Sequence, residues 1–250
     1  RVMAALEECG VADNTIVLFA SDNGCSPMVD FDELDALGHH PSYHFRGHKA
    51  DIYEGGHRVP LIVRWPAKIA PGRSTDRTVC LVDLLATCAN LLEAELPDNA
   101  AEDSVSNLPL WTGEPPDAPI RETTVHHSID GSFSIRRGKW KLEMCPGSGG
   151  WSEPRPGDAC RGLPPVQLYD LESDVGERRN LCDEHPEVVK ELTARLTQIV
   201  VTGRSTPGPP QPHTGPATWS QLWWIDLETD RRLGYNVPDR RKRRLDRRPD

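Results

Sequence analysis

Two apolar runs, each next to a polar, glycine-rich segment, decide the fold of this chain. The first run, IVLFA (residues 16–20), leads directly into the turn SDNG (21–24). The second run, LIV (61–63), follows the segment RGHKADIYEGGHRVP (46–60) and continues into RWP (64–66). Each run is short, rich in strand-forming residues and free of polar alternation, which predicts two buried strands. A helical pattern at residues 2–9 precedes the first strand, and this order favours the α/β class.

Polar side chains stand where such a sheet is expected to bind a ligand. In an open α/β sheet, ligands bind just beyond the carboxyl ends of the strands, and Asp22 and Asn23 fall at that place. A carboxylate and an amide oxygen can both coordinate one hard cation. Lys49 lies in the glycine-rich segment, and its ammonium group suits an oxyanion. The sequence therefore predicts a site for a cation and an anionic ligand.

The motifs of this region resemble the carboxyl-terminal half of type I sulfatases, the formylglycine-dependent family related in fold to alkaline phosphatase. They are DNG at 22–24, RGxK at 46–49, YEGGxRVP at 53–60 and RWP at 64–66. DNG alone is a common turn, whereas DNG followed by RGxK and YEGGxRVP in this order is highly specific. The resemblance implies that Asp22 and Asn23 are calcium (Ca2+) ligands and that Lys49 holds the sulfate group. It also implies an α/β fold, with part of an alkaline-phosphatase-like mixed sheet and flanking helices, plus a small C-terminal antiparallel sheet with one helix.

Composition and charge limit the classes of partner. The chain has 250 residues, of which 37% are hydrophobic and 27% charged, and its net charge is -9. Such a chain can bury a sizeable core, and its acidic balance argues against nucleic acid as a partner. No apolar stretch reaches the length of a membrane span. The seven cysteines form neither a disulfide-scaffold pattern nor pairs at metal-ligand spacing.

We predict three regions along the chain. Residues 1–118 form the C-terminal part of the sulfatase catalytic domain, with a helix at 79–92 on which Asp83 is a cap or a surface partner. Residues 119–203 form a small subdomain of four short strands and one helix. Residues 204–250 form a Pro/Gly linker, a tryptophan anchor and a basic tail. The anchor residues are Trp219, Trp223 and Trp224.

The small subdomain is predicted from local patterns. Strands are expected at 123–127, 133–136, 140–143 and 167–171, with hairpin turns at 130–131 and 137–139. A helix is expected to begin at Pro186 and to stop at Gly203, because proline opens helices and glycine closes them. This region also resembles the sulfatase C-terminal subdomain, through RxGKxKL at 136–142, LYDL at 168–171 and GExxNL at 176–181.

Histidines are the further candidates for substrate binding. His126 and His127 are adjacent on a predicted strand, so at most one of them points into a cleft from an ideal strand. His40 belongs to a long polar segment, residues 25–45, strung between the metal pair and Lys49. Each of these residues has a structural or solvated alternative role. A sulfated sugar needs hydrogen-bond partners for its hydroxyls, and Trp151 could place an aromatic face on the same rim.

The chain begins at Arg1 inside a helical pattern, so we expect a fragment without its signal segment. The resemblance implies that the formylglycine, its arginine and the remaining metal ligands lie in the amino-terminal half of the same protein, which is thereby a partner of this chain. The segment CSPMV (25–29) only partly mimics the C-x-P-S-R modification signature, because Met28 and Val29 replace the required Ser and Arg. Cys25 is interpreted as a small residue beside the site.

The predicted function is that of a sulfuric ester hydrolase, with a sulfated sugar favoured over an aryl sulfate. Arg58 is expected to brace Glu54 or the loop rather than touch substrate. The chain alone is expected to bind calcium weakly and to hydrolyse nothing, since two ligands do not fill a calcium site. Two alternatives remain: a phosphate or phosphonate ester hydrolase of the same superfamily, and a non-catalytic sugar-binding relative. The resemblance alone favours a periplasmic or secreted location.

Overall fold

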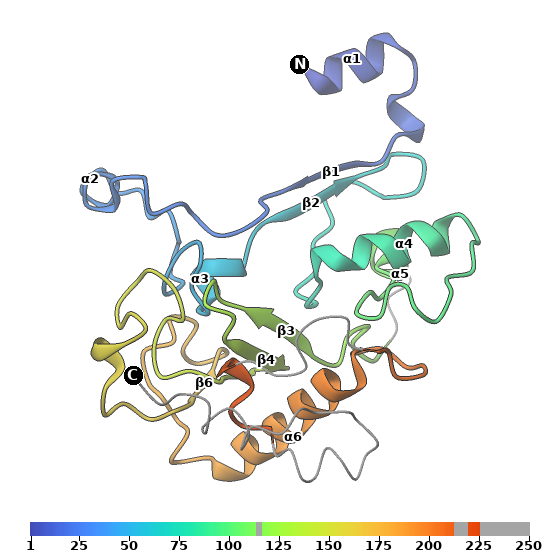
Figure 1. The fold of residues 1–250 in the computed structure, drawn as a ribbon. Coiled ribbons are helices and arrows are strands. Elements are labelled where there is room, and N and C mark those ends of the chain that lie inside the picture. The colour runs from blue at the N-terminus through green and yellow to red at the C-terminus, as the bar shows by residue number, and fades with distance from the viewer. Residues whose placement is uncertain (114–116, 213–219, 226–250) are drawn as a thin grey trace, which may run out of the picture.

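A computed structural model describes residues 1–113, 117–212 and 220–225 (Figure 1). It contains two antiparallel sheets with helices around them, and the second sheet with its one long helix matches the predicted C-terminal antiparallel sheet. The first sheet has two strands, β1 (Val17–Ala20) and β2 (Leu61–Arg64). The second has four strands in the order β3-β4-β5-β6. Their bounds are β3 Thr124–His127, β4 Phe133–Arg137, β5 Trp140–Glu143 and β6 Gln167–Asp170.

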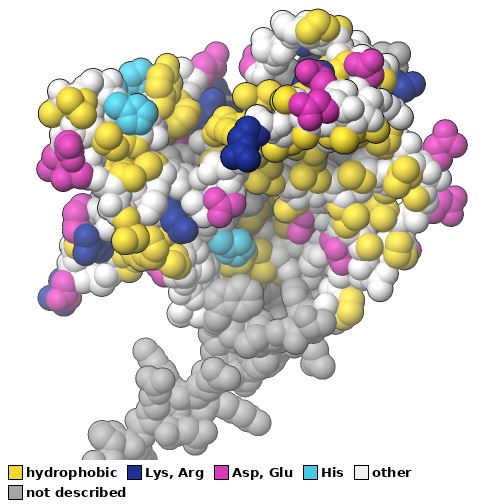
Figure 2. All heavy atoms as spheres, turned by 90° about the horizontal axis from the view of Figure 1, so that it is seen from above, with side chains coloured by type: hydrophobic (Ala, Val, Ile, Leu, Met, Phe, Trp, Pro, Cys, Tyr) yellow, Lys and Arg dark blue, Asp and Glu magenta, His cyan; other side chains and the backbone are white. Residues whose placement is uncertain are grey.

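The two-stranded sheet forms an arm that extends above the rest of the molecule, with α1 (Val2–Glu8) beyond it (Figure 1). The prediction that its strands are buried is wrong for the described part of the chain. Phe19 is 63% exposed and Ile62 is 60% exposed, and α1 buries none of its residues. The apolar runs were identified correctly as strands, but no described element covers their outer face. Figure 2, which looks down on this side, shows hydrophobic side chains exposed over much of it.

The four-stranded sheet forms the best packed part of the molecule. Its long helix, α6 (Pro186–Thr202), ends at Gly203, whose positive φ of 67° is a conformation that glycine adopts without a Cβ penalty. Leu192, Leu196 and Ile199 of this helix are buried against the sheet, so α6 covers one of its faces. The strands and the helix predicted for this subdomain are confirmed. The core consists of Phe133, Ile135, Leu142, Met144, Leu168, Leu192, Leu196, Ile199 and Leu222.

Shorter helices differ in detail from the predicted ones. The helix expected at 79–92 is a 3-10 turn, η2 (Leu81–Asp83), followed by α4 (Leu84–Leu91). The long polar segment contains a short helix, α2 (Phe31–Ala36), whose first turn is capped by the Asp30 carboxylate. The remaining short elements are η1 Ala12–Asn14, α3 Glu54–His57, α5 Leu108–Thr112, η3 Asp158–Cys160 and η4 Ser220–Leu222.

Two smaller predictions can be compared with the structure. Asp83 caps η2 as expected, but it is fully buried and paired with Arg121, so it is not a surface residue. Trp223 donates its indole N–H to the Met144 carbonyl, and Trp224 packs on the core, which supports an anchoring role for this pair. Trp219 and the basic tail lie outside the described residues. Within the described residues, no helix combines the length and the apolar character needed to cross a membrane.

Candidate functional site

The antiparallel pairing of β1 with β2 brings the two motif segments to one end of the arm. Ala20, the last residue of β1, lies opposite Leu61, the first residue of β2. The turn that follows β1 therefore meets the segment that precedes β2. The Gly24 N–H donates to the Gly56 carbonyl at 2.9 Å. A Cβ at Gly24 would collide with the Gly55 carbonyl, so this close approach requires glycine.

Asp22 and Asn23 form the candidate metal pair. Asp22 is exposed, and its carboxylate has no hydrogen-bond or ion-pair partner among the described residues. Asn23 donates from Nδ2 to the Gly24 carbonyl at 2.9 Å, which leaves its Oδ1 as a possible ligand. Two oxygen donors fit a calcium ion, but such an ion takes 6–8 oxygen ligands. The described residues contain no group of three or more His, Cys, Asp or Glu side chains able to hold a metal.

Lys49 lies directly beside this pair. Its backbone N–H donates to the Cys25 carbonyl at 2.9 Å, two residues beyond Asn23, so the interpretation of Cys25 as a neighbour of the site agrees with the geometry. Within the described part of the chain, the Lys49 ammonium has no hydrogen-bond or ion-pair partner. An unpaired ammonium and an unpaired carboxylate therefore stand on two turns that are hydrogen-bonded to each other. The carboxylate can bind a cation, and that cation and the ammonium can then contact the same anion.

A buried ionic cluster supports the segment behind Lys49. Glu54 opens α3 and is 1% exposed, and its carboxylate lies 3.2 Å from Lys141 Nζ and 3.2 Å from an Arg58 guanidinium nitrogen. The expectation that Arg58 braces Glu54 is thus confirmed. Lys141 is fully buried and also lies 2.7 Å from Glu177 and 3.3 Å from Glu143. The cluster joins α3 to β5 and to the turn after β6.

The electrostatics of this cluster keep its central pair charged. Burial raises the pKa of Glu54, but Lys141 and His57 lower it more, so the net pKa lies below the ordinary value. Burial likewise lowers the pKa of Lys141, while Glu177 and Glu54 raise it above the ordinary value. Glu143 differs, because burial dominates and raises its pKa well above the usual range. Lys141 and Glu54 are therefore ionised at neutral pH, and the neutral form of Glu143 is favoured.

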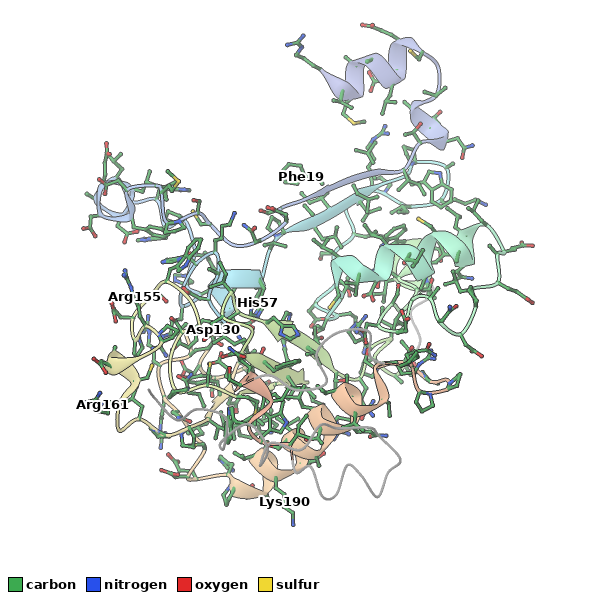
Figure 3. The ribbon with its side chains drawn as sticks, viewed as in Figure 1. Phe19, His57, Asp130, Arg155, Arg161 and Lys190 are labelled. Atoms are coloured by element: carbon green, nitrogen blue, oxygen red, sulfur yellow. The ribbon has the colours of Figure 1, made fainter. Side chains whose placement is uncertain are left out.

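Two histidines form a stacked pair above this cluster. The His57 ring lies 3.8 Å from the His126 ring, at an interplanar angle of 21°. His57 Nε2 lies 3.3 Å from Glu54 Oε1 and 3.4 Å from Lys141 Nζ. Burial lowers the pKa of His57 to about 4 and lowers the pKa of His126 well below its usual value, so both rings are neutral at pH 7. Figure 3 places His57 at the end of α3, next to β3.

Sequence reasoning missed His57. It occupies the variable position of YEGGxRVP, three residues after Glu54, and that spacing on one helical turn was the available signal. Its Nδ1 and the Nδ1 of His126 are buried without a hydrogen-bond partner in the described structure. These two nitrogen atoms are not exposed to a ligand in this conformation, while the stacked rings pack α3 against β3 and also line a cavity.

The predicted substrate-binding histidines fall in two places. His126 and His127 both border a cavity of 1210 Å³ that Asp22 and His57 also line. His126 is half-buried against His57, whereas His127 is exposed and packs its ring against Phe133. His40 does not belong to this group. It pairs with Asp35 at 2.9 Å and borders a separate cavity of 640 Å³.

Comparison with known proteins identifies the family. Residues 1–94 match the family model described as Sulfatase. The chain is 36% identical over 209 residues to an N-acetylgalactosamine-6-O-sulfatase of Bacteroides thetaiotaomicron, an alignment that covers 80% of this chain and 39% of that protein. It is 33% identical over 212 residues to arylsulfatase A of Bos taurus, covering 79% of this chain and 39% of the relative.

Solved structures agree with the sequence relatives. A structure from work on glycosaminoglycan metabolism by Bacteroides thetaiotaomicron aligns with a TM-score of 0.67 and 33% identity, over 79% of this chain and 41% of that chain. The chain thus spans about two fifths of the length of these relatives. The motifs, the fold and the relatives agree, and we conclude that this chain belongs to the sulfatase family, with the alkaline-phosphatase-like α/β fold that its sequence predicts.

Proposed function

We propose that this chain supplies a calcium-binding pair and a sulfate-binding lysine to a sulfuric ester hydrolase that acts on a sulfated sugar. One observation carries the proposal: the backbone bond from Lys49 to Cys25 fastens the lysine turn to the turn that carries Asp22 and Asn23. The substrate class is supported by the relative named N-acetylgalactosamine-6-O-sulfatase, which shares 36% of its aligned residues with this chain.

Each group has a chemical role in this proposal. Sulfate ester hydrolysis needs a nucleophile, stabilisation of charge on the sulfuryl oxygens, and an acid for the leaving oxygen. Asp22 and Asn23 hold the calcium ion, which supplies positive charge near the sulfuryl oxygens when bound. Lys49 binds a sulfuryl oxygen with its ammonium group, as a charge-assisted hydrogen bond. His126 and His127, on the cavity shared with Asp22, contact the sugar.

We infer that the other residues of the catalytic site belong to a part of the protein outside this chain. The remaining calcium ligands and the formylglycine nucleophile come from the part of the relatives' length that this chain does not span. That part, the amino-terminal half of the same protein, is the partner that completes the site. The chain alone then binds calcium weakly and hydrolyses no sulfate ester. Export to the periplasm or to the outside of the cell belongs to the same proposal.

The test uses the intact protein that contains this chain. Replacing Lys49 by Ala lowers kcat/KM for a sulfated monosaccharide by about 10²–10³-fold, the scale for removing one group that stabilises transition-state charge. Lys68→Ala is the control, because Lys68 is exposed and lies beyond β2. Removing calcium with a chelator abolishes turnover, and added calcium restores it. Unchanged kcat/KM in the Lys49 variant would contradict the proposal.

The same protein separates the alternatives. Rates on a matched sulfate ester and phosphate ester distinguish a sulfatase from a phosphate or phosphonate ester hydrolase. Sugar binding without turnover of either ester would indicate a non-catalytic relative. His126→Ala and His127→Ala raise KM if these rings contact the sugar. His40→Ala is tested separately, since His40 borders a different cavity.

A further inference from the structure

Asp51 lies two residues after Lys49, and its carboxylate is buried without a lysine or arginine partner in the described structure. The residue is 2% exposed, and its side chain is fully buried. A buried carboxylate is costly unless it is hydrogen-bonded, so its partners indicate what it does. Among the described residues, the one basic group within 4 Å of this carboxylate is the His48 ring, whose Nδ1 lies 3.5 Å from Asp51 Oδ2.

Both Asp51 oxygens are occupied by backbone amides from two separate segments. Oδ2 accepts a hydrogen bond from the His48 N–H at 2.9 Å, inside the turn that carries Lys49. Oδ1 accepts from the Trp151 N–H at 2.7 Å and from the Ser152 N–H at 3.1 Å. The carboxylate therefore links the Lys49 turn to a loop about 100 residues further along the chain. Three backbone amide donors thus satisfy the acceptor oxygens of this buried side chain.

Glycines on both sides make room for this link. A Cβ at Gly47 would lie 2.8 Å from Asp51 Oδ2, and a Cβ at Gly150 would collide with Oδ1. Gly47 also has a positive φ of 74°, which a residue with a side chain rarely adopts. The carboxylate thus fits closely between the backbone at Gly47 and the backbone at Gly150.

Further bonds hold the same turn from the same side. Ala50 has a φ of 85°, an uncommon conformation for a residue with a Cβ, and its carbonyl accepts from the Ile129 N–H at 2.9 Å. Ile52 donates to the Ser148 carbonyl at 2.8 Å and accepts from Lys141 Nζ at 2.9 Å. A strained backbone persists only where its surroundings determine it. The loops of the small subdomain therefore fix the conformation of the turn around Lys49.

We propose that Asp51 is a positioning residue that holds the Lys49 turn against the Trp151 loop. The distance between the sulfate-binding ammonium of Lys49 and the Trp151 ring, which faces the sugar, then stays constant. This inference rests on the proposed function of Lys49. Trp151 is 41% exposed, so its ring is available to a sugar at the end of a loop whose backbone Asp51 holds. Asp51 itself touches no substrate.

The test compares Asp51→Asn with wild type in the intact protein. The amide group keeps the shape but turns one acceptor oxygen into a donor that faces backbone N–H groups. We expect kcat/KM for a sulfated monosaccharide to fall at least about tenfold and the inhibition constant of inorganic sulfate to rise by a similar factor. The calcium concentration for half-maximal activity changes less than about twofold, because no hydrogen bond joins Asp51 to Asp22 or Asn23 in the described part of the chain.

Asp83→Asn is the matched control. Asp83 is also a fully buried carboxylate that accepts two backbone N–H groups, from Cys80 and Val105, but it belongs to the cap of η2. We expect this variant to lower the melting temperature without changing the sulfate inhibition constant. Equal sulfate inhibition constants in wild type and Asp51→Asn would overturn the proposal.

A second readout does not depend on activity. Hydrogen exchange at the amides of His48, Trp151 and Ser152 is slow in wild type and fast in Asp51→Asn, whereas amides of α6 are unchanged. Gly150→Ala, which displaces the same carboxylate, gives the same pattern.

Fast exchange at the amides of His48, Trp151 and Ser152 in wild type overturns the link itself. Failure of both variants to fold also contradicts the proposal, because Asp51 would then serve stability alone. Protected amides in a wild-type protein that turns over no sulfate ester instead refute the proposed function, and the positioning role with it.

Discussion

The arm formed by β1 and β2 and the subdomain formed by β3–β6 and α6 use apolar residues in opposite ways. In the subdomain, Ile135, Leu142 and Leu196 are fully buried between the sheet and the helix. In the arm, Phe19 and Ile62 are mostly exposed. Both regions consist of antiparallel strands with suitable composition, so strand formation alone does not explain the difference. The difference in burial depends on whether another element covers the sheet. In the described structure, α6 covers the four-stranded sheet, and no element covers the outer face of the arm.

The candidate site lies where these two regions meet. The arm contributes the turn of Asp22 and Asn23, and the well-packed subdomain holds the Lys49 turn through Asp51, Ile52 and the Lys141 cluster. Rigid support on one side and an uncovered surface on the other agree with a site that needs further chain to complete it. This contrast can be tested by changes placed in each region.

The largest effect on stability is expected at Lys141. Replacing it by Met leaves Glu54 and Glu177 without their buried ammonium, which lowers the free energy of unfolding by about 3–5 kcal/mol. Lys139→Met is the control, since the Lys139 side chain is 44% exposed and pairs with Asp170 at the surface, and we expect a much smaller change. Urea unfolding of the two variants measures the difference. Similar losses would show that the buried cluster does not stabilise the subdomain.

A core substitution and an arm substitution compare the two regions directly. Leu196→Ala removes a fully buried side chain between α6 and the sheet and lowers the free energy of unfolding by about 2–5 kcal/mol. Phe19→Ala in the same chain changes it by less than about 0.5 kcal/mol, because Phe19 is 63% exposed. Urea unfolding of this chain checks both values. Equal losses would contradict the difference in packing.

The stacked histidines make the free energy of unfolding depend on pH. The pKa of His57 is lowered to about 4 in the folded chain, while the unfolded chain has the ordinary value of 6.5. As the pH falls from 6.5 towards 4, the unfolded state takes up the proton first, so stability is present above pH 6.5 and is lost across this window. The loss is up to about 3 kcal/mol. Urea unfolding at pH 7 and pH 5 measures it, and His57→Gln is expected to flatten the slope. An unchanged slope would exclude His57 as its source.

The smallest effect on the stability of this chain is expected for Phe19→Ser, and the same substitution tests whether the arm is covered in the intact protein. Phe19→Ser is nearly neutral for the stability of the chain alone. In the intact protein, where further chain covers the arm under the proposed function, the same change leaves a cavity and a buried hydroxyl, so it lowers the free energy of unfolding by about 3–5 kcal/mol and lowers the melting temperature with it. Met28→Ser, at an exposed loop position, is the control. A neutral Phe19→Ser in both forms would indicate that the arm stays uncovered.

Local signals predicted the subdomain well and long-range contacts poorly. Hairpin turns and the Pro186 to Gly203 boundaries are set by nearby residues, so the strands and α6 were found from sequence. The motifs identified Asp22, Asn23 and Lys49, and the structure brings their turns together. The roles of Asp51 and Lys141 could not be predicted, because each depends on a contact about 90 to 100 residues away, from Trp151 to Asp51 and from Lys141 to Ile52. An apolar run indicates a strand but not the layer that covers it, so the predicted burial of the arm is wrong for the described structure.

Under the proposed function, Asp22, Asn23 and Lys49 act on one anion. A crystal structure of the intact protein grown with calcium and sulfate decides this. We predict a calcium ion on the Asp22 and Asn23 oxygens at about 2.3–2.6 Å. We also predict a sulfate oxygen that contacts this calcium ion and lies about 2.7–2.9 Å from Lys49 Nζ. Calcium bound elsewhere, or a Lys49 ammonium directed away from the sulfate, would contradict it.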